Sequence, residues 1–330
     1  MKILKNNHIP NEQWQQLLAS SPTASYFQSK DCFDFYQTLP FAEGFAYALE
    51  NEGSLKALVC GYSIADGGKL KQLFSKRAII PGGVMIHPDC TQDELGQLLT
   101  ATRKSLKSKA IYTEMRNYFD YTAYKTVFEQ HGFEYHAHLN FHLDSSNYDL
   151  AFKNLKQNKR RYIRLSIKEG AEWCATKDLN EIKELYHILD QLYKNKVKTP
   201  LFPFAFFEQL SKEEHSLFIV VKYLNKVIGG SIFVISPNKA IYEWFVCGED
   251  RLYKNVYPSI LATWGGIEYA TKNNLPLFDF MGAGKPDIEY GVRDFKSEFG
   301  GQLVEHGRFT SVSNKLLYNI GTLYIKLLKR

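Results

Sequence analysis

The sequence of 330 residues predicts an α/β protein in which two domains repeat one order of elements. The length suits two domains of ordinary size. A strand–turn–strand pattern occurs once in each half, and each time a further strand, a helix and another strand follow. Duplication of one unit explains this recurrence, with a mixed, mostly antiparallel sheet flanked by helices in each domain. The alternative is that such runs recur by chance in α/β chains.

The first domain is expected to span residues 1–144. Its elements are a hairpin at 45–64, a strand at 69–74, a Pro-Gly-Gly loop at 81–83, a helix at 92–108 and a strand at 110–116. From residue 135 to residue 143 apolar and polar side chains alternate, which predicts a half-buried strand. Its polar face carries His136, His138 and His142 without acidic neighbours at ligand spacing, so we expect no metal site.

The second domain is expected to span residues 145–310. Residues 148–168 predict one long helix that Asn147 caps, and an amphipathic helix follows near residues 182–192. Then come a hairpin at 218–235, a strand at 240–246, a helix at 258–272 and a strand at 275–281. Beyond the second domain, a helical apolar stripe consists of Leu316, Ile320, Leu323, Tyr324 and Leu327.

Composition indicates the class of protein rather than its reaction. Hydrophobic residues make up 45% of the chain and the net charge is +6, a mild basic bias that attracts phosphates but does not indicate DNA as a partner. The five cysteines form no CxxC pair, which favours a reducing compartment. No signal peptide and no transmembrane run is found, so we expect a cytoplasmic protein. GxSxG, GxxxxGK[ST] and HExxH motifs are absent from the sequence.

A basic segment from Lys153 to Lys168 contains no acidic residue. Arg160, Arg164 and Lys168 recur at helical spacing and share one face. Guanidinium groups bind phosphates through paired hydrogen bonds, so Arg160 and Arg164 are candidate ligand-binding residues. A solvated basic face is the alternative interpretation.

A glycine-rich, aromatic segment at residues 278–301 is the second candidate site. Glycines at a strand end let the backbone approach a ligand closely. Lys296 lies between Phe295 and Phe299 in the sequence, and an enclosed ammonium group could neutralise an oxyanion or a phosphate. The alternative is an ordinary loop whose aromatic side chains fill the core.

These residues resemble the Fem family of peptidyltransferases. The closest correspondence is Tyr290-Gly-Val-Arg-Asp-Phe-Lys-Ser-Glu-Phe-Gly, which is similar to the family's G-V-x-x-F-K-x-x-F-G ending. Phe278-Asp-Phe-Met-Gly resembles a family strand end, and residues 159–170 resemble the helix that opens the family's second domain. Phe27-Gln28-Ser29 is a weaker correspondence near the start.

The resemblance implies two tandem GNAT-like (acetyltransferase-like) domains, with the active cleft in the second. It also implies that residues 311–330 return to the first domain, although the same stripe could contact an anionic membrane surface weakly. The activity implied is aminoacyl transfer from tRNA to an amine of a UDP- or lipid-linked muropeptide. Lys296 is then the catalytic residue, and the substrate-binding residues are Phe295, Tyr290, Arg293, Phe299, Arg160, Arg164, Tyr242, Trp244 and Gly282.

Two features of the family are missing: a substrate-binding lysine early in the first domain and a coiled-coil arm in the second. Acyl transfer from a coenzyme A thioester is therefore an alternative, although Arg251 is followed by neither glycine of the usual pyrophosphate loop. A non-catalytic module that binds a phosphorylated glycan or RNA is another. No tightly bound cofactor is expected, because the donor, aminoacyl-tRNA or thioester, acts as a co-substrate.

Overall fold

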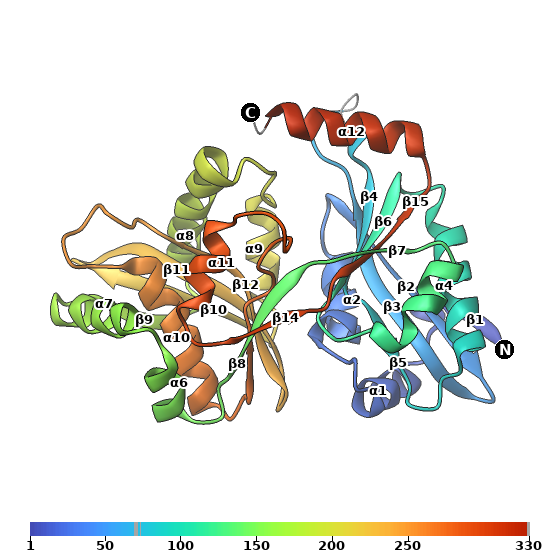
Figure 1. The fold of residues 1–330 in the computed structure, drawn as a ribbon, viewed down its shortest axis with the longest axis horizontal. Coiled ribbons are helices and arrows are strands. Elements are labelled where there is room, and N and C mark those ends of the chain that lie inside the picture. Colours follow the sequence, from blue (N-terminus) through green and yellow to red (C-terminus); the bar gives the residue numbers. More distant parts are fainter. Residues whose placement is uncertain (69–71, 73, 329–330) are drawn as a thin grey trace. The chain divides into compact units, whose positions relative to one another are not determined.

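The computed structural model describes residues 1–68, 72 and 74–328 as a mixed α/β protein (Figure 1). The chain divides into two compact units, one made of Met1–Ala137 with Glu305–Arg330 and the other of His138–Val304. The expected boundaries at residues 144 and 310 therefore lie within the second and the first unit, respectively. The strands near each expected boundary explain the difference, as described below.

The first unit contains a mostly antiparallel sheet covered by helices. Its strands follow the order β1 (Lys2–Lys5), β2 (Ala42–Asn51), β3 (Ser54–Ile64), β4 (Arg77–Gly82), β6 (Tyr112–Asn117), β15 (Arg308–Val312) and β7 (Glu134–His136), with β5 (Val84–Ile86) beside β3. Strands β4 and β6 are parallel, and the crossover between them contains α4 (Gln92–Leu106). This unit also contains the α-helices α1 (Asn11–Ser20), α2 (Lys30–Gln37), α5 (Lys125–Gln130) and α12 (Lys315–Leu328).

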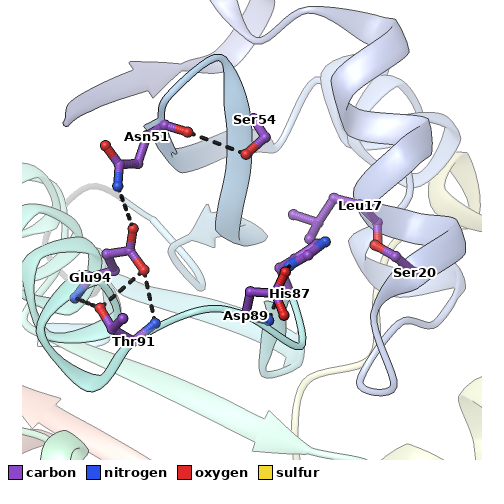
Figure 2. A network of polar contacts seen from close by, with 8 residues as sticks. All are labelled: Leu17, Ser20, Asn51, Ser54, His87, Asp89, Thr91 and Glu94. Carbon is purple, nitrogen blue, oxygen red and sulfur yellow. Dashed lines mark hydrogen bonds and ion pairs between the residues drawn. The ribbon is translucent and has the colours of Figure 1, made fainter.

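Helix α4 begins where the sequence favours a helix start. Thr91 Oγ1 accepts a hydrogen bond from Glu94 N, and the Glu94 carboxylate accepts one from Thr91 N, which forms a capping box (Figure 2). Asn51 Nδ2 at the end of β2 also donates to Glu94, at 2.8 Å. One carboxylate therefore fixes the helix start to the sheet, and Leu95, Leu98 and Leu99 are buried in the core.

The second unit repeats this architecture. Its strands follow the order β9 (Glu172–Thr176), β10 (Ser216–Tyr223), β11 (Lys226–Ser236), β12 (Ala240–Gly248), β13 (Leu277–Asp279), β8 (Leu139–Asp144) and β14 (Gln302–Glu305). Strands β12 and β13 are parallel, with α10 (Pro258–Lys272) in the crossover. The other helices are α6 (Tyr148–Asn154), α7 (Gln157–Lys168), α8 (Leu179–Leu192), α9 (Phe204–Leu210) and α11 (Gly291–Ser297).

The central hairpins of the two units match residue by residue. The β2–β3 turn is Glu52-Gly53 and the β10–β11 turn is Leu224-Asn225, and all four residues have positive φ, as a type I′ turn requires. In both hairpins the register then skips one residue of the second strand, at Lys56 and at Ile228. The same turn, the same bulge and the same strand order confirm the predicted pair of repeated α/β units.

The strand expected at residues 135–143 is in fact two strands in two sheets. Strand β7 pairs with β15 in the first unit, whereas β8 pairs with β13 in the second. Alternation of apolar and polar side chains continues across the break, so the pattern hides the change of sheet. His136 and His142 consequently do not share one strand face.

The helix expected at residues 148–168 is broken between α6 and α7. Leu155 and Lys156 are extended, with ψ of 143° and 150°. Lys156 N donates to Glu298 O, and Arg160 Nη1 donates to Leu155 O at 2.6 Å and to Lys153 O. The two Arg160 bonds satisfy carbonyl groups at the end of α6, and the Lys156 bond ties the break to Glu298. Most of the strand expected at residues 69–74 lies outside the described residues; β4 is the next strand to pair with β3.

Helix α12 packs on the first unit through a different face from the one expected. Leu317, Tyr318 and Gly321 are half-buried, and the Tyr318 ring lies 5.2 Å from the Tyr112 ring, centre to centre. Leu316 and Leu323 of the predicted stripe are instead exposed, at 70% and 60%. The expectation that this stripe packs inward is wrong for Leu316 and Leu323, because the side of the helix that carries Leu317 and Tyr318 faces the sheet instead.

Candidate active site in the second unit

Strands β12 and β13 separate after a short paired stretch. Their ladder joins Ala240 to Leu277 and ends where Tyr242 meets Asp279, although β12 continues to Gly248. In the first unit the equivalent ladder between β4 and β6 continues from Arg77 to Gly82. The second unit therefore opens its sheet at Glu243, and the backbone that follows β13 must find hydrogen-bond partners outside the ladder.

Lys296 supplies those partners. Its side chain rises from α11 and is only 7% exposed. The Lys296 Nζ donates to Phe280 O and, at 2.8 Å, to Gly282 O. Burial lowers the pKa of Lys296, and the carboxylates of Glu243 and Asp279 oppose that shift. The ammonium group is thus held at the opening of the sheet, inside the protein.

Glu243 is the acidic partner of Lys296 on β12. Its carboxyl group is buried, and its Oε1 accepts a hydrogen bond from Thr263 Oγ1 of α10 at 2.8 Å. Its Oε2 has no hydrogen-bond partner among the residues that the structure describes. Burial raises the pKa of Glu243 to about 7, although Lys296 and Thr263 lower it. A buried acid and a buried base therefore interact beside the opening.

Asp279, at the end of β13, holds the turn that carries the carbonyl partners of Lys296. Its carboxylate accepts hydrogen bonds from Asn140 Nδ2 at 2.7 Å and Met281 N at 2.6 Å, and lies 3.1 Å from His142 Nε2. Asn140 Oδ1 in turn accepts from Gly282 N. This network holds Met281 and Gly282 at positive φ and fixes the direction of their carbonyl groups.

The aromatic side chains around Lys296 have different positions. Phe299 is fully buried in the core, whereas Phe295 is half-buried. Lys159 Nζ lies 4.1 Å from the centre of the Phe295 ring and 3.2 Å from Glu298 Oε2. Burial lowers the pKa of Lys159, and Glu298 opposes the shift. Lys159 is therefore a buried cation near α11, which the helical spacing did not indicate, because Lys159 precedes the face formed by Arg160, Arg164 and Lys168.

Arg293 and Tyr290 shape the loop before α11. Arg293 Nε donates to Ala283 O at 2.9 Å, and its Nη2 donates to Lys285 O. The guanidinium thus holds the loop that contains Gly282. Tyr290 precedes α11 and is 43% exposed, so its ring is open to a ligand.

Of the remaining predicted residues, Tyr242 borders the opening of the sheet, and Trp244, Arg160 and Arg164 have partners elsewhere in the unit. Tyr242 is buried on β12, and Trp244 packs edge-on against Phe206 of α9 at 5.2 Å between ring centres. Arg160 is bonded to carbonyl groups at the end of α6, and Arg164 lies 5.3 Å from the Phe152 ring. Both arginines therefore have partners within the protein, and the basic face is less open than the helical spacing suggested.

A pocket of about 410 Å³ lies at the start of α10. Its walls include Lys159, Arg251, Tyr253, Tyr257 and Phe295. Pro258 is the first residue of α10 and has no N–H, while Ser259 N and Ser259 Oγ donate to the carboxylate of Asp250 at 3.2 and 2.6 Å. A carboxylate of the protein therefore occupies the helix start, where an anionic ligand would otherwise bind.

A cationic cluster in the first unit also went unpredicted. Arg116 Nε and Arg308 Nη1 approach the same oxygen of Glu114, at 2.7 and 3.2 Å. Two guanidinium groups share one carboxylate, and both are partly exposed. The sequence offers no local signal for this cluster, because β15 brings Arg308 beside β6 only in the folded sheet.

The comparisons with known proteins agree with this geometry. The model of the FemAB family matches residues 83–326, most of the chain. The chain belongs to the FemAB family. The predicted resemblance is therefore confirmed, and the motif around Phe295 and Lys296 lies within the matched FemAB region.

Solved structures show the same fold at low sequence identity. FemX aligns with a TM-score of 0.72 and 14% identity over 97% of this chain and 99% of its own. L-PGS from Bacillus licheniformis aligns with a TM-score of 0.57 and 13% identity over 97% and 98%. A tandem GNAT protein from the clavulanic acid biosynthesis pathway aligns with a TM-score of 0.57 and 10% identity over 94% and 99%. This FemAB chain is thus a tandem GNAT-like protein.

No curated protein has a sequence that matches this FemAB chain. Among the helices of the described residues, none has the length and apolar character needed to cross a bilayer.

Proposed function

We propose that this Fem-type transferase moves an aminoacyl group from aminoacyl-tRNA to an amine of a UDP- or lipid-linked peptidoglycan precursor. Membership of the FemAB family supports transfer chemistry. The observation that carries the proposal is the buried ammonium of Lys296 at the point where β12 and β13 separate. Cytoplasmic location is part of the same proposal, because both substrates would be made there.

In this proposal Lys296 stabilises the transition state. The acceptor amine attacks the ester carbonyl carbon, a C–N bond forms, and the carbonyl oxygen gains negative charge. Lys296 Nζ uses two N–H groups on Phe280 O and Gly282 O, which leaves one for that oxyanion. The ester C–O bond then breaks, and the proton that the amine loses passes to the departing ribose hydroxyl.

No strong general base is required, because an aminoacyl ester is already activated and positioning supplies much of the rate. Glu243 acts through Lys296 as a positioning residue, since its negative charge favours the protonated ammonium. Arg293 and Asp279 keep the Gly282 carbonyl in place. Of these groups, Glu243 and Asp279 favour the protonated form of Lys296.

The pocket at α10 supports an RNA donor. Tyr253, Tyr257 and Phe295 provide aromatic faces, and Lys159 and Arg251 provide positive charge. Aromatic rings that stack bases beside cations that bind phosphates are typical of single-stranded nucleic acid sites.

The thioester alternative is disfavoured by the start of α10. Coenzyme A binders of this fold place a pyrophosphate on backbone N–H groups there. In this chain Pro258 lacks that N–H and Asp250 accepts from Ser259 N, so a pyrophosphate would meet a carboxylate. A non-catalytic binding module would keep the pocket but would not need a buried ammonium beside Glu243.

The experiment is a panel of donors and acceptors with the purified protein. Labelled aminoacyl-tRNA and acyl thioesters are each offered with UDP-muropeptide, a lipid-linked muropeptide or simple amines. We expect label transfer from aminoacyl-tRNA to a muropeptide, and none from thioesters. Transfer from a thioester alone would replace the donor in the proposal, and saturable binding without turnover of any donor would support the non-catalytic alternative.

A further inference from the structure

Helix α12 has an apolar stripe on its outer side. Leu316, Ile320 and Leu323 recur at helical spacing and are 70%, 43% and 60% exposed. Exposed leucines and isoleucines in a row cost free energy in water, whereas singly scattered ones are ordinary. The stripe therefore calls for a partner.

The orientation of α12 is set by its inner side. Ser313 N and Asn314 N donate to Ile111 O at 2.8 and 3.1 Å, just before the helix begins. Tyr318 then packs edge-on against Tyr112, at the start of β6. Figure 1 shows α12, in dark red, at the ends of β4 and β6. The stripe is therefore held outward by contacts on the opposite side of the helix.

The C-terminal segment that contains the stripe is basic in sequence. From His306 to Arg330 the sequence contains no acidic residue, but it contains Arg308, Lys315, Lys326, Lys329 and Arg330. Lys315, Asn319 and Thr322 follow one another at the same helical spacing as the stripe, are exposed, and form its polar flank.

The surface beside α12 also carries an exposed apolar side chain and an exposed basic one. Phe74 is 37% exposed, and a Cβ on Gly321 of α12 would lie 2.9 Å from Phe74 O, so the two segments touch. Lys76 is exposed, and its carbonyl oxygen accepts a hydrogen bond from Ile111 N, the residue that also anchors α12. Apolar and basic side chains thus continue beside the helix.

We propose that this surface docks on an anionic lipid membrane, with α12 lying in the plane of the interface. A narrow apolar stripe flanked by lysines is the pattern of interfacial helices. A protein partner buried on the same stripe would leave the lysine flank without a role, whereas an anionic leaflet uses both. Each lysine or arginine near such a surface contributes on the order of 1 kcal/mol, so this cluster supports reversible binding.

The test is co-sedimentation of the full chain with vesicles. We expect partitioning into phosphatidylglycerol vesicles to exceed that into phosphatidylcholine vesicles by about tenfold or more, and to weaken as salt rises. Leu316→Asp with Leu323→Asp should abolish binding. The matched control is Leu179→Asp with Leu224→Asp, which adds equal charge at exposed leucines of the second unit and should bind as the unchanged protein does.

Several results would overturn the proposal. One is equal binding to both vesicle types, and another is an equal loss of binding in the control variant. A third is the absence of vesicle binding together with a dimer that dissociates when Leu316 and Leu323 are replaced with Asp. That third result would mean that a second copy of the chain covers the stripe. If Leu316→Asp with Leu323→Asp fails to fold, Lys315→Gln with Lys326→Gln decides: weaker binding to anionic vesicles supports docking and unchanged binding contradicts it. Vesicle binding is measured without donor or acceptor, so its outcome is independent of the proposed transfer.

Discussion

At the scale of single residues, the proposed activity depends on whether Lys296 carries its proton. Lys296 and Glu243 are both buried, and each moves the pKa of the other toward the charged form. Burial opposes both charges, and each group partly offsets that penalty for the other. The main-chain carbonyl groups of Phe280 and Gly282 add the hydrogen bonds that a buried ammonium needs.

Replacing Lys296 with Met should remove the group that stabilises the oxyanion. We expect kcat to fall by about a hundredfold or more, as for the loss of one oxyanion donor. Transfer from aminoacyl-tRNA measures the effect, with Lys226→Met, an exposed lysine in the β10–β11 hairpin, as the control. A circular dichroism melt monitors folding. A Lys296→Met protein with unchanged kcat would exclude Lys296 from the mechanism.

Replacing Glu243 with Gln should change the pH dependence of transfer. The Glu243 carboxylate raises the pKa of Lys296, so its removal lets Lys296 lose its proton at a lower pH. Activity requires the ammonium, and the alkaline limb of the kcat/KM profile should therefore shift to lower pH. Glu268→Gln, which removes a carboxylate bonded to Lys272 instead, should leave that limb in place. An unshifted profile in Glu243→Gln would show that Glu243 does not act on Lys296.

At the scale of elements, short-range geometry decides where strands and helices turn or stop. The Leu224-Asn225 turn requires positive φ at both residues, yet leucine is poorly suited to that conformation. The equivalent turn of the first unit has Glu52 at the position of Leu224 and Gly53 at the position of Asn225, so both hairpins hold a non-glycine residue at positive φ in the first turn position. The second hairpin thus retains a strained residue that the surrounding strands hold in place.

Leu224→Asn should stabilise that hairpin. Asparagine tolerates the left-handed conformation, so we expect the free energy of unfolding to rise by about 0.5 to 1 kcal/mol. Urea denaturation followed by far-UV circular dichroism measures the change. Leu224→Ala removes the same exposed side chain without relieving the strain, and it should not stabilise the protein. Equal effects in the two variants would point to surface hydrophobicity rather than to φ.

At the scale of the whole molecule, each unit completes its sheet with a strand from a distant part of the sequence. Strand β15 follows the entire second unit in sequence, yet it lies between β6 and β7 of the first unit. Its Phe309 is buried and stacks on Phe128, with the ring centres 4.1 Å apart. The first unit therefore cannot form its core until the chain has been made beyond residue 304.

Phe309→Ala should therefore weaken the first unit selectively. Loss of a buried phenylalanine costs about 3 to 5 kcal/mol. Hydrogen exchange resolved by peptide should show lost protection in β6 and β7 and little change in β12. A uniform loss across both units would mean that they unfold as one cooperative system, and a single unfolding free energy would then describe the chain.

The sequence predicted the elements that local patterns encode. Helix α10 begins at Pro258 and ends at Lys272 as expected, because a proline at the first turn and a continuous apolar run are local signals. The pair of hairpins and the Phe-Lys-containing motif were likewise recognisable. Features that depend on tertiary contacts were not: neither the burial of Glu243 near Lys296 nor the outward orientation of the α12 stripe can be recognised from local spacing.

The amino-acid order alone determined that one α/β unit occurs twice and that Lys296 stands within a Fem-type motif, since periodicity, turn residues and motifs are properties of neighbouring positions. Only the folded chain decided that β7 and β8 belong to different sheets, that β12 parts from β13, and that a carboxylate lies beside Lys296. Those outcomes depend on contacts between residues far apart in sequence, and burial then sets the charges that local patterns cannot reveal.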